Sequence, residues 1–61
     1  MSKYMLVIKD DDGDMHAHFY ETYAEADGSR MDAEVSLGWY VEMYERMKNE
    51  ETGLEYYEFM Y

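Results

Sequence analysis

The chain has no cysteine, no proline, and only five lysine and arginine residues among its 61 residues. Without cysteine it can form no disulfide, no thiolate metal site and no cysteine nucleophile. Its apolar run, residues 4–8, is five residues long and is followed by Lys9. Such a run is too short for a signal peptide or a membrane span. We therefore expect a cytoplasmic protein that gains no stability from covalent cross-links.

Acidic residues, in contrast, are abundant. Fifteen aspartates and glutamates give a formal net charge of −10, yet 18% of the chain is aromatic. Disordered acidic segments are poor in aromatic residues, so the composition indicates a folded polyanion. We expect one domain over residues 1–61. A chain of this size buries only about 60% of the surface its unfolded form exposes, and a homodimer is one way to enlarge so thin a core.

The first half of the chain predicts a β-hairpin followed by a helix. Residues 4–9 form a β-branched, apolar strand that ends at an Asp-Gly turn signal within residues 10–14. In residues 15–20 an alternating pattern predicts a second strand that pairs with the first and buries one face. The residues expected on that buried face are Met15, Ala17 and Phe19.

Thr22 and Glu25 have the spacing of a capping box, which predicts a helix over about residues 23–37 that ends at Gly38. One side of this helix has Ala24, Gly28, Met31 and Val35, and a second side has Tyr23, Ala26, Ala33 and Leu37. We expect Gly28 to let the helix approach the sheet closely. The apolar side that the sheet leaves uncovered is a candidate dimer or partner surface.

Residues 39–47 alternate again and predict a third strand with Trp39, Val41 and Met43 on one face. Residues 49–53 predict a hairpin loop, and residues 54–61 a fourth strand with Tyr57, Phe59 and Tyr61 on one face. The predicted fold class is α+β, a four-stranded antiparallel sheet with one helix on one face in the order ββαββ.

Two acidic or histidine-rich segments invite a metal-site interpretation. If Gly13 takes the glycine position of an EF-hand loop, Ile8 and Phe19 fall at ligand positions that need oxygen, so the motif fails. Asp14, His16 and His18 project from one strand face and form an alternative, weak site for zinc or a similar ion. We predict no resident metal and no cofactor.

The sequence also lacks the signals of an enzyme or a nucleic-acid-binding protein. No histidine lies near a serine in a nucleophile arrangement, and a domain this thin has little room for a catalytic pocket. No basic patch or phosphate-binding glycine loop is present, and the net charge opposes contact with phosphates. We expect no catalysis, no direct binding of nucleic acid and no membrane association.

The acids themselves are the best functional signal. Carboxylates two residues apart on a strand are about 6.5 to 7 Å apart, and those four or seven apart on a helix about 6 to 10 Å apart. These distances are similar to the phosphate spacing of a nucleic-acid strand, so the chain could occupy a basic groove built for DNA. Tyrosines add contact area at low entropic cost. The predicted partner-binding residues are Asp10, Asp11, Asp12, Asp14, Glu21, Glu25, Asp32, Glu42, Glu45, Glu55, Glu58, Tyr20, Tyr40, Tyr44 and Tyr56.

In size, acidity and lack of catalytic residues, the chain resembles the small phage-encoded nucleic-acid mimics, such as anti-CRISPR and anti-restriction proteins. The resemblance covers the whole chain as composition and involves no sequence motif. It implies a stoichiometric inhibitor acting in the cytoplasm of a host cell on a protein with a basic nucleic-acid-binding groove, a CRISPR effector being one example. The alternative is a homodimeric interaction module without mimicry. It would associate through the helix side with Leu37, or through the sheet face with Tyr40, Tyr44 and Tyr56.

Overall fold

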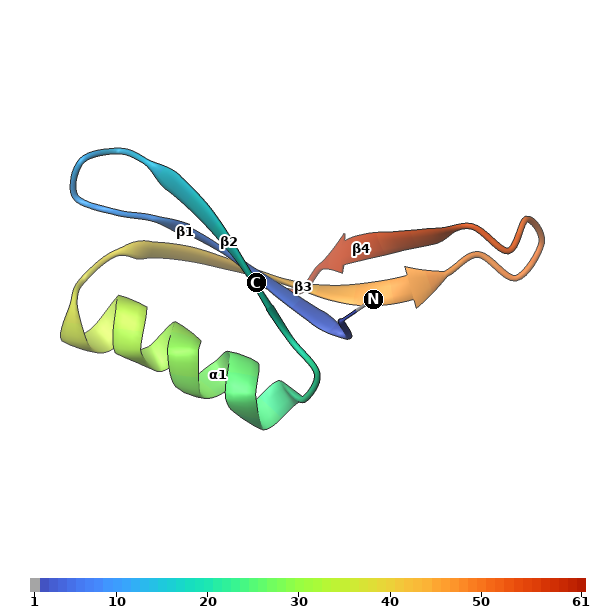
Figure 1. The fold of residues 1–61 in the computed structure, drawn as a ribbon, viewed down its shortest axis with the longest axis horizontal. Coiled ribbons are helices and arrows are strands. Elements are labelled where there is room, and N and C mark those ends of the chain that lie inside the picture. Colours follow the sequence, from blue (N-terminus) through green and yellow to red (C-terminus); the bar gives the residue numbers. More distant parts are fainter. Residues whose placement is uncertain (1) are drawn as a thin grey trace.

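A computed structural model of the chain describes residues 2–61 and shows one antiparallel sheet covered on one face by a helix (Figure 1). The strand order is β2-β1-β3-β4, and the helix lies between β2 and β3 in the chain. This confirms the predicted α+β fold with its four antiparallel strands. The elements are β1 (Tyr4–Lys9), β2 (Met15–Tyr20), α1 (Tyr23–Met31), β3 (Tyr40–Lys48) and β4 (Glu55–Phe59).

The β1–β2 turn forms where the Asp-Gly signal predicts it. The amide of Gly13 donates to the carbonyl of Asp10, and the amide of Asp10 donates to the carbonyl of Asp14, both at 3.0 Å. Gly13 has a φ of 86°, the left-handed conformation that closes such a loop and that glycine adopts without steric cost. The loop pairs Lys9 with Met15 and thereby fixes the register of the whole hairpin.

The helix begins at the predicted cap. Thr22 Oγ1 accepts the amide of Glu25 at 3.2 Å, and the Thr22 hydroxyl donates to the Glu25 carboxylate at 2.8 Å. After Met31 the helix widens into a π-helical turn, η1 (Asp32–Ser36), in which the amide of Leu37 donates to the carbonyl of Asp32. Helical structure therefore extends as far as predicted, although its last turn is wider than an α-helix.

Alanine, and not glycine, lets the helix lie close to the sheet. Ala26 is fully buried and Ala33 is 4% exposed, whereas Gly28 is exposed and has open space where a Cβ would be. The expectation that Gly28 permits the close approach is therefore wrong. The helix turns the Ala26 side to the sheet because its small side chains fit between the backbones, while Val35 and Leu37 stay exposed.

The core lies between the helix and the two central strands. Leu6 and Met43, directly opposite each other on β1 and β3, are completely buried. Ile8 and Val41 extend this layer, and the two buried alanines of the helix cover it. Around this core pack the partly buried side chains of Tyr4, Tyr20, Trp39 and Met60. Trp39, Val41 and Met43 thus share the core-facing side of the third strand, as their alternation predicts.

The predicted buried face of β2 is wrong. Leu6 pairs with His18 and Ile8 with His16, so the two histidines share the helix side of the sheet with the core residues. Met15, Ala17 and Phe19 consequently lie on the other face, where they are exposed. The alternation correctly identified a strand, but the pairing register decided which of its faces the helix covers.

The two C-terminal residues contact both the third strand and the helix. Beyond β4, the amide of Met60 donates to the carbonyl of Met43 at 2.8 Å, and the amide of Met43 donates to the carbonyl of Tyr61 at 2.6 Å. The Tyr61 hydroxyl hydrogen-bonds that of Tyr23, and the Arg30 guanidinium lies 5.3 Å from the Tyr61 ring centre. Tyr61 therefore contacts the helix. Its alternation with Tyr57 and Phe59 predicted that all three share one face, and for Tyr61 this prediction is wrong.

Two glycine substitutions should have opposite effects on stability. Gly13→Ala places a side chain at positive φ, and we expect a loss of about 1 kcal/mol. Gly28→Ala meets no atom within 4 Å and should stabilise the helix by roughly 0.5–1 kcal/mol. Urea unfolding followed by circular dichroism measures both. A loss of stability in Gly28→Ala would contradict the exposed position of Gly28.

Candidate functional site

The sheet divides the predicted partner-binding residues between its two faces. We call the side away from α1 the open face. Tyr44 pairs with Phe59 and Lys48 with Glu55, which places Glu55 on the open face together with Tyr40, Glu42 and Tyr44. On the helix side lie Tyr20, Glu45, Tyr56 and Glu58. Tyr56 therefore does not share a face with Tyr40 and Tyr44, and the sheet surface expected from those three tyrosines is not formed.

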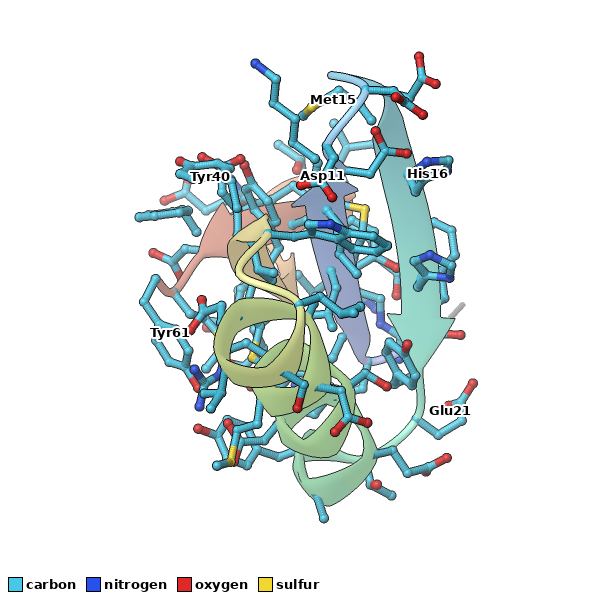
Figure 2. The ribbon with its side chains drawn as sticks, turned by 90° about the vertical axis from the view of Figure 1, so that its left-hand side faces the viewer. Asp11, Met15, His16, Glu21, Tyr40 and Tyr61 are labelled. Atoms are coloured by element: carbon cyan, nitrogen blue, oxygen red, sulfur yellow. The ribbon has the colours of Figure 1, made fainter. Side chains whose placement is uncertain are left out.

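Five exposed acids gather around β2, at the edge of the sheet. Asp11, Asp12 and Asp14 lie in the turn before this strand, and Glu21 and Glu25 follow its other end. Figure 2 shows Asp11 near one end of β2 and Glu21 beyond the other. A strand of six residues is roughly 20 Å long, so two groups of carboxylates flank it at about that separation. We call these five residues the acidic edge.

Asp10 has a structural role that sets it apart from its neighbours in the turn. Its Oδ1 accepts the amides of Asp12 and Asp14, both at 3.0 Å, and its Oδ2 lies 2.8 Å from His16 Nε2. The hydrogen bond with His16 and those from the two amides hold the pKa of Asp10 below its ordinary value. Its stabilising effect is therefore present above the unfolded pKa and disappears as the pH falls through the folded pKa.

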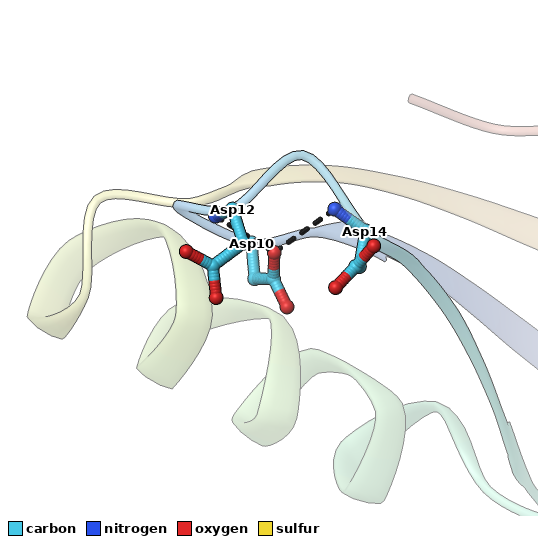
Figure 3. Close-up of side chains that lie close together, drawn as sticks. All are labelled: Asp10, Asp12 and Asp14. Carbon is cyan, nitrogen blue, oxygen red and sulfur yellow. Dashed lines mark hydrogen bonds between the residues drawn. The ribbon is translucent and has the colours of Figure 1, made fainter.

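The turn brings Asp10, Asp12 and Asp14 together, with one carboxylate oxygen of each within 4.8 Å of the others (Figure 3). The oxygens of Asp10 already accept two backbone amides and contact His16. The predicted alternative of Asp14, His16 and His18 is not assembled either, because His16 is paired with Asp10. Nothing besides the carboxylates themselves indicates an ion at this turn, so we assign no metal to it.

Glu42 is held in the middle of the open face by two tyrosines. The hydroxyls of Tyr40 and Tyr44 donate to its two carboxylate oxygens, each at 2.9 Å. These hydrogen bonds to a carboxylate raise the pKa of both tyrosines. Three of the predicted partner-binding residues thus form one ordered group, which the alternation of β3 placed on a single face.

Part of the acidic charge is neutralised within the fold. Arg30 donates to Asp27 at 2.7 and 2.9 Å and to Glu34 at 2.8 Å, and its pKa is raised above the ordinary value by these carboxylates, Asp27 first. Lys3 Nζ lies 3.2 Å from Glu45, which directly opposes Glu58 across the strands. None of these three pairs involves one of the five residues of the acidic edge.

The open face also gathers aromatic side chains that the sequence did not single out as functional. The ring centres of Phe19 and Tyr57, from the two edge strands, are 6.2 Å apart, and those of Tyr44 and Phe59 are 5.6 Å apart. The alternation of Tyr57 with Phe59 placed these two on one face. It could not show that Phe19 lies there too, because that depends on the register of β2.

No pocket opens on the surface of residues 2–61, so the candidate sites are surfaces and not cavities. In the same residues, no helix combines the length and apolar character needed to cross a bilayer. Comparison with protein-family models, curated protein sequences and solved structures finds no match to the chain. The function of this protein must therefore be inferred from its own geometry and charge.

Proposed function

We propose that the protein is a stoichiometric inhibitor whose acidic edge competes with nucleic acid for a positively charged groove on a partner protein. The observation that supports this most directly is the composition of residues 10–29. Seven of the fifteen acids lie in this stretch, and it has no lysine or arginine. Five of the seven form the acidic edge beside the exposed strand β2, whereas Asp10 is held within the turn and Asp27 is paired with Arg30.

The density of charge suits this role. The molecule is 40 Å long, so a net charge of −10 corresponds to about one negative charge per 4 Å. A nucleic-acid strand has one phosphate per about 3.4 Å. The acidic loops of the two hairpins lie at opposite ends of the long axis (Figure 1), so the charge extends over most of the length of the molecule.

Such a surface can inhibit a partner protein by binding alone, without catalysing a reaction. Groups of carboxylates held by a fold gain the same kind of electrostatic steering and counterion release from a basic groove that phosphates do. This mechanism is the one suggested by the resemblance to phage-encoded inhibitors. It makes a nucleic-acid-guided effector of the CRISPR type a reasonable first target, met in the cytoplasm of the host cell.

A displacement assay tests the proposal. A fluorescent duplex is bound to a purified CRISPR effector or another DNA-binding protein with a basic groove, and the inhibitor is titrated in at several salt concentrations. The edge variant has five amides, Asp11→Asn, Asp12→Asn, Asp14→Asn, Glu21→Gln and Glu25→Gln. If each exposed charge contributes about 0.5 kcal/mol, the five together contribute about 2.5 kcal/mol, and we expect the inhibition constant to rise on the order of 100-fold.

The matched control removes the same number of charges elsewhere, with Glu45→Gln, Glu50→Gln, Glu51→Gln, Glu55→Gln and Glu58→Gln. We expect this control to lose less than about 10-fold, because its substitutions lie away from β2. Equal losses of inhibition in the two variants would show that only net charge matters. They would contradict a binding surface confined to the acidic edge. An inhibition constant indifferent to salt would contradict electrostatic competition altogether.

A further inference from the structure

The open face is an apolar surface that the fold leaves uncovered. An antiparallel sheet with one solvated face normally alternates apolar and polar residues, with the polar ones outside. Here the solvated face has aromatic and methionine side chains, of which Met15, Phe19, Tyr40 and Phe59 are between 55% and 58% exposed. Contiguous apolar surface of this kind marks an interaction site in soluble proteins.

The charges of the open face differ from those of the rest of the chain. By register, the strands place Lys9, Arg46 and Lys48 on this face, together with Glu42 and Glu55. These five residues sum to +1, so the remainder of the chain has a charge of −11. The fold therefore separates an acidic helix side with acidic loops from a nearly neutral, aromatic sheet face.

We infer that the open face binds the open face of a second copy of this chain. A strongly basic partner would bind the acidic side instead of this nearly neutral face. A surface with both signs of charge around an aromatic centre is complementary to itself under a two-fold axis. Lys9 and Lys48 of one copy can then approach Glu42 and Glu55 of the other.

The separation of charge removes the main objection to self-association of a polyanion. Two sheets packed face to face lie about 10 Å apart, and both acidic sides point outward from this pair. The opposing acids are then separated by more than the Debye length, about 8 Å at physiological ionic strength, so their repulsion is screened. The dimer buries the aromatic faces and presents an acidic edge on each of its two copies.

Sedimentation equilibrium of the full chain tests this inference. We expect a reversible dimer at micromolar concentration. Phe19→Asp and Phe59→Asp each introduce a charge into the open face, which the dimer would bury. Each should raise the dissociation constant of the dimer at least 100-fold. Circular dichroism shows whether each variant remains folded, and Met15→Glu serves as a third variant because Met15 is 57% exposed on the same face.

The control is Leu37→Asp. Leu37 is 55% exposed, as Phe19 is, but it lies at the end of the helix and represents the other apolar surface that could pair. It should leave the dissociation constant unchanged. A chain that stays monomeric at 100-fold higher concentration would overturn the inference, and so would a dimer that Leu37→Asp alone disrupts.

The inferred dimer and the proposed inhibition can be tested independently of each other. The open-face variants keep all five residues of the acidic edge, so they should still displace DNA in the assay above. If wild type is monomeric and Phe59→Asp abolishes displacement, the open face binds the target and the second copy is excluded. If wild type dimerises but does not displace DNA, the inferred dimer is supported and the proposed DNA mimicry is contradicted.

Discussion

Replacing Leu6 with alanine is expected to remove a third or more of the stability of this protein. Leu6 is fully buried at the centre of the sheet, opposite Met43, which is also fully buried. Truncation of such a leucine costs about 2–5 kcal/mol, because the lost burial is added to the cost of a cavity. A domain of this length has a total stability of roughly 3–9 kcal/mol.

The measurement is urea denaturation at one fixed protein concentration, since any association would make the apparent stability depend on concentration. The matched control is Val35→Ala, a truncation at a helix position that is 74% exposed. It should change the free energy of unfolding by less than about 0.5 kcal/mol. Similar losses in the two variants would mean that Leu6 is not in the core.

Enlarging Ala26 to leucine should produce the second large loss. Ala26 is fully buried where α1 faces the sheet, and leucine adds three carbon atoms at a contact that has no space for them. Overpacking of this kind costs about 1–3 kcal/mol, because the helix must move away from Leu6 and Met43. The same urea experiment measures the loss.

Ala24→Leu provides the comparison on the same helix. Ala24 is exposed, and leucine has nearly the helix propensity of alanine, so the stability should change by less than about 0.5 kcal/mol. A stability of Ala26→Leu equal to that of Ala24→Leu would show that α1 does not lie against the sheet through this side. Because neither substitution changes the charge of the helix, the acidic edge is the same in both variants.

The local features of the fold could be predicted because each depends on neighbouring residues. Gly13 and the aspartates around it determine a turn whatever the rest of the chain does, since the loop is closed by their own backbone and side-chain hydrogen bonds. Thr22 and Glu25 likewise mark the start of the helix. The alternation in β3 correctly placed Val41 and Met43 on one face and Tyr40, Glu42 and Tyr44 on the other.

The errors in the predicted burial of β2 and of the helix have one cause. In β2, Met15, Ala17 and Phe19 form an apolar set, and a strand with this pattern usually buries it. Their burial requires that they share a face with Leu6, but the hairpin loop pairs Leu6 with His18. On the helix, the sides containing Ala26 and Gly28 looked equally able to approach a sheet, and only packing against Leu6 and Met43 distinguished them.

Composition and local pattern were enough to predict the charge, the order of the strands and helix along the chain, the turns and the acidic stretch of residues 10–29. These follow from composition and from interactions between residues close in the chain. Tertiary structure alone decided that β1 lies between β2 and β3, that the helix covers the Leu6 side of the sheet, and that Phe19, Tyr44, Tyr57 and Phe59 share the open face. The physical reason is that a strand has two faces related by a shift of one residue, and only its partners in the sheet and the layer packed on it select between them.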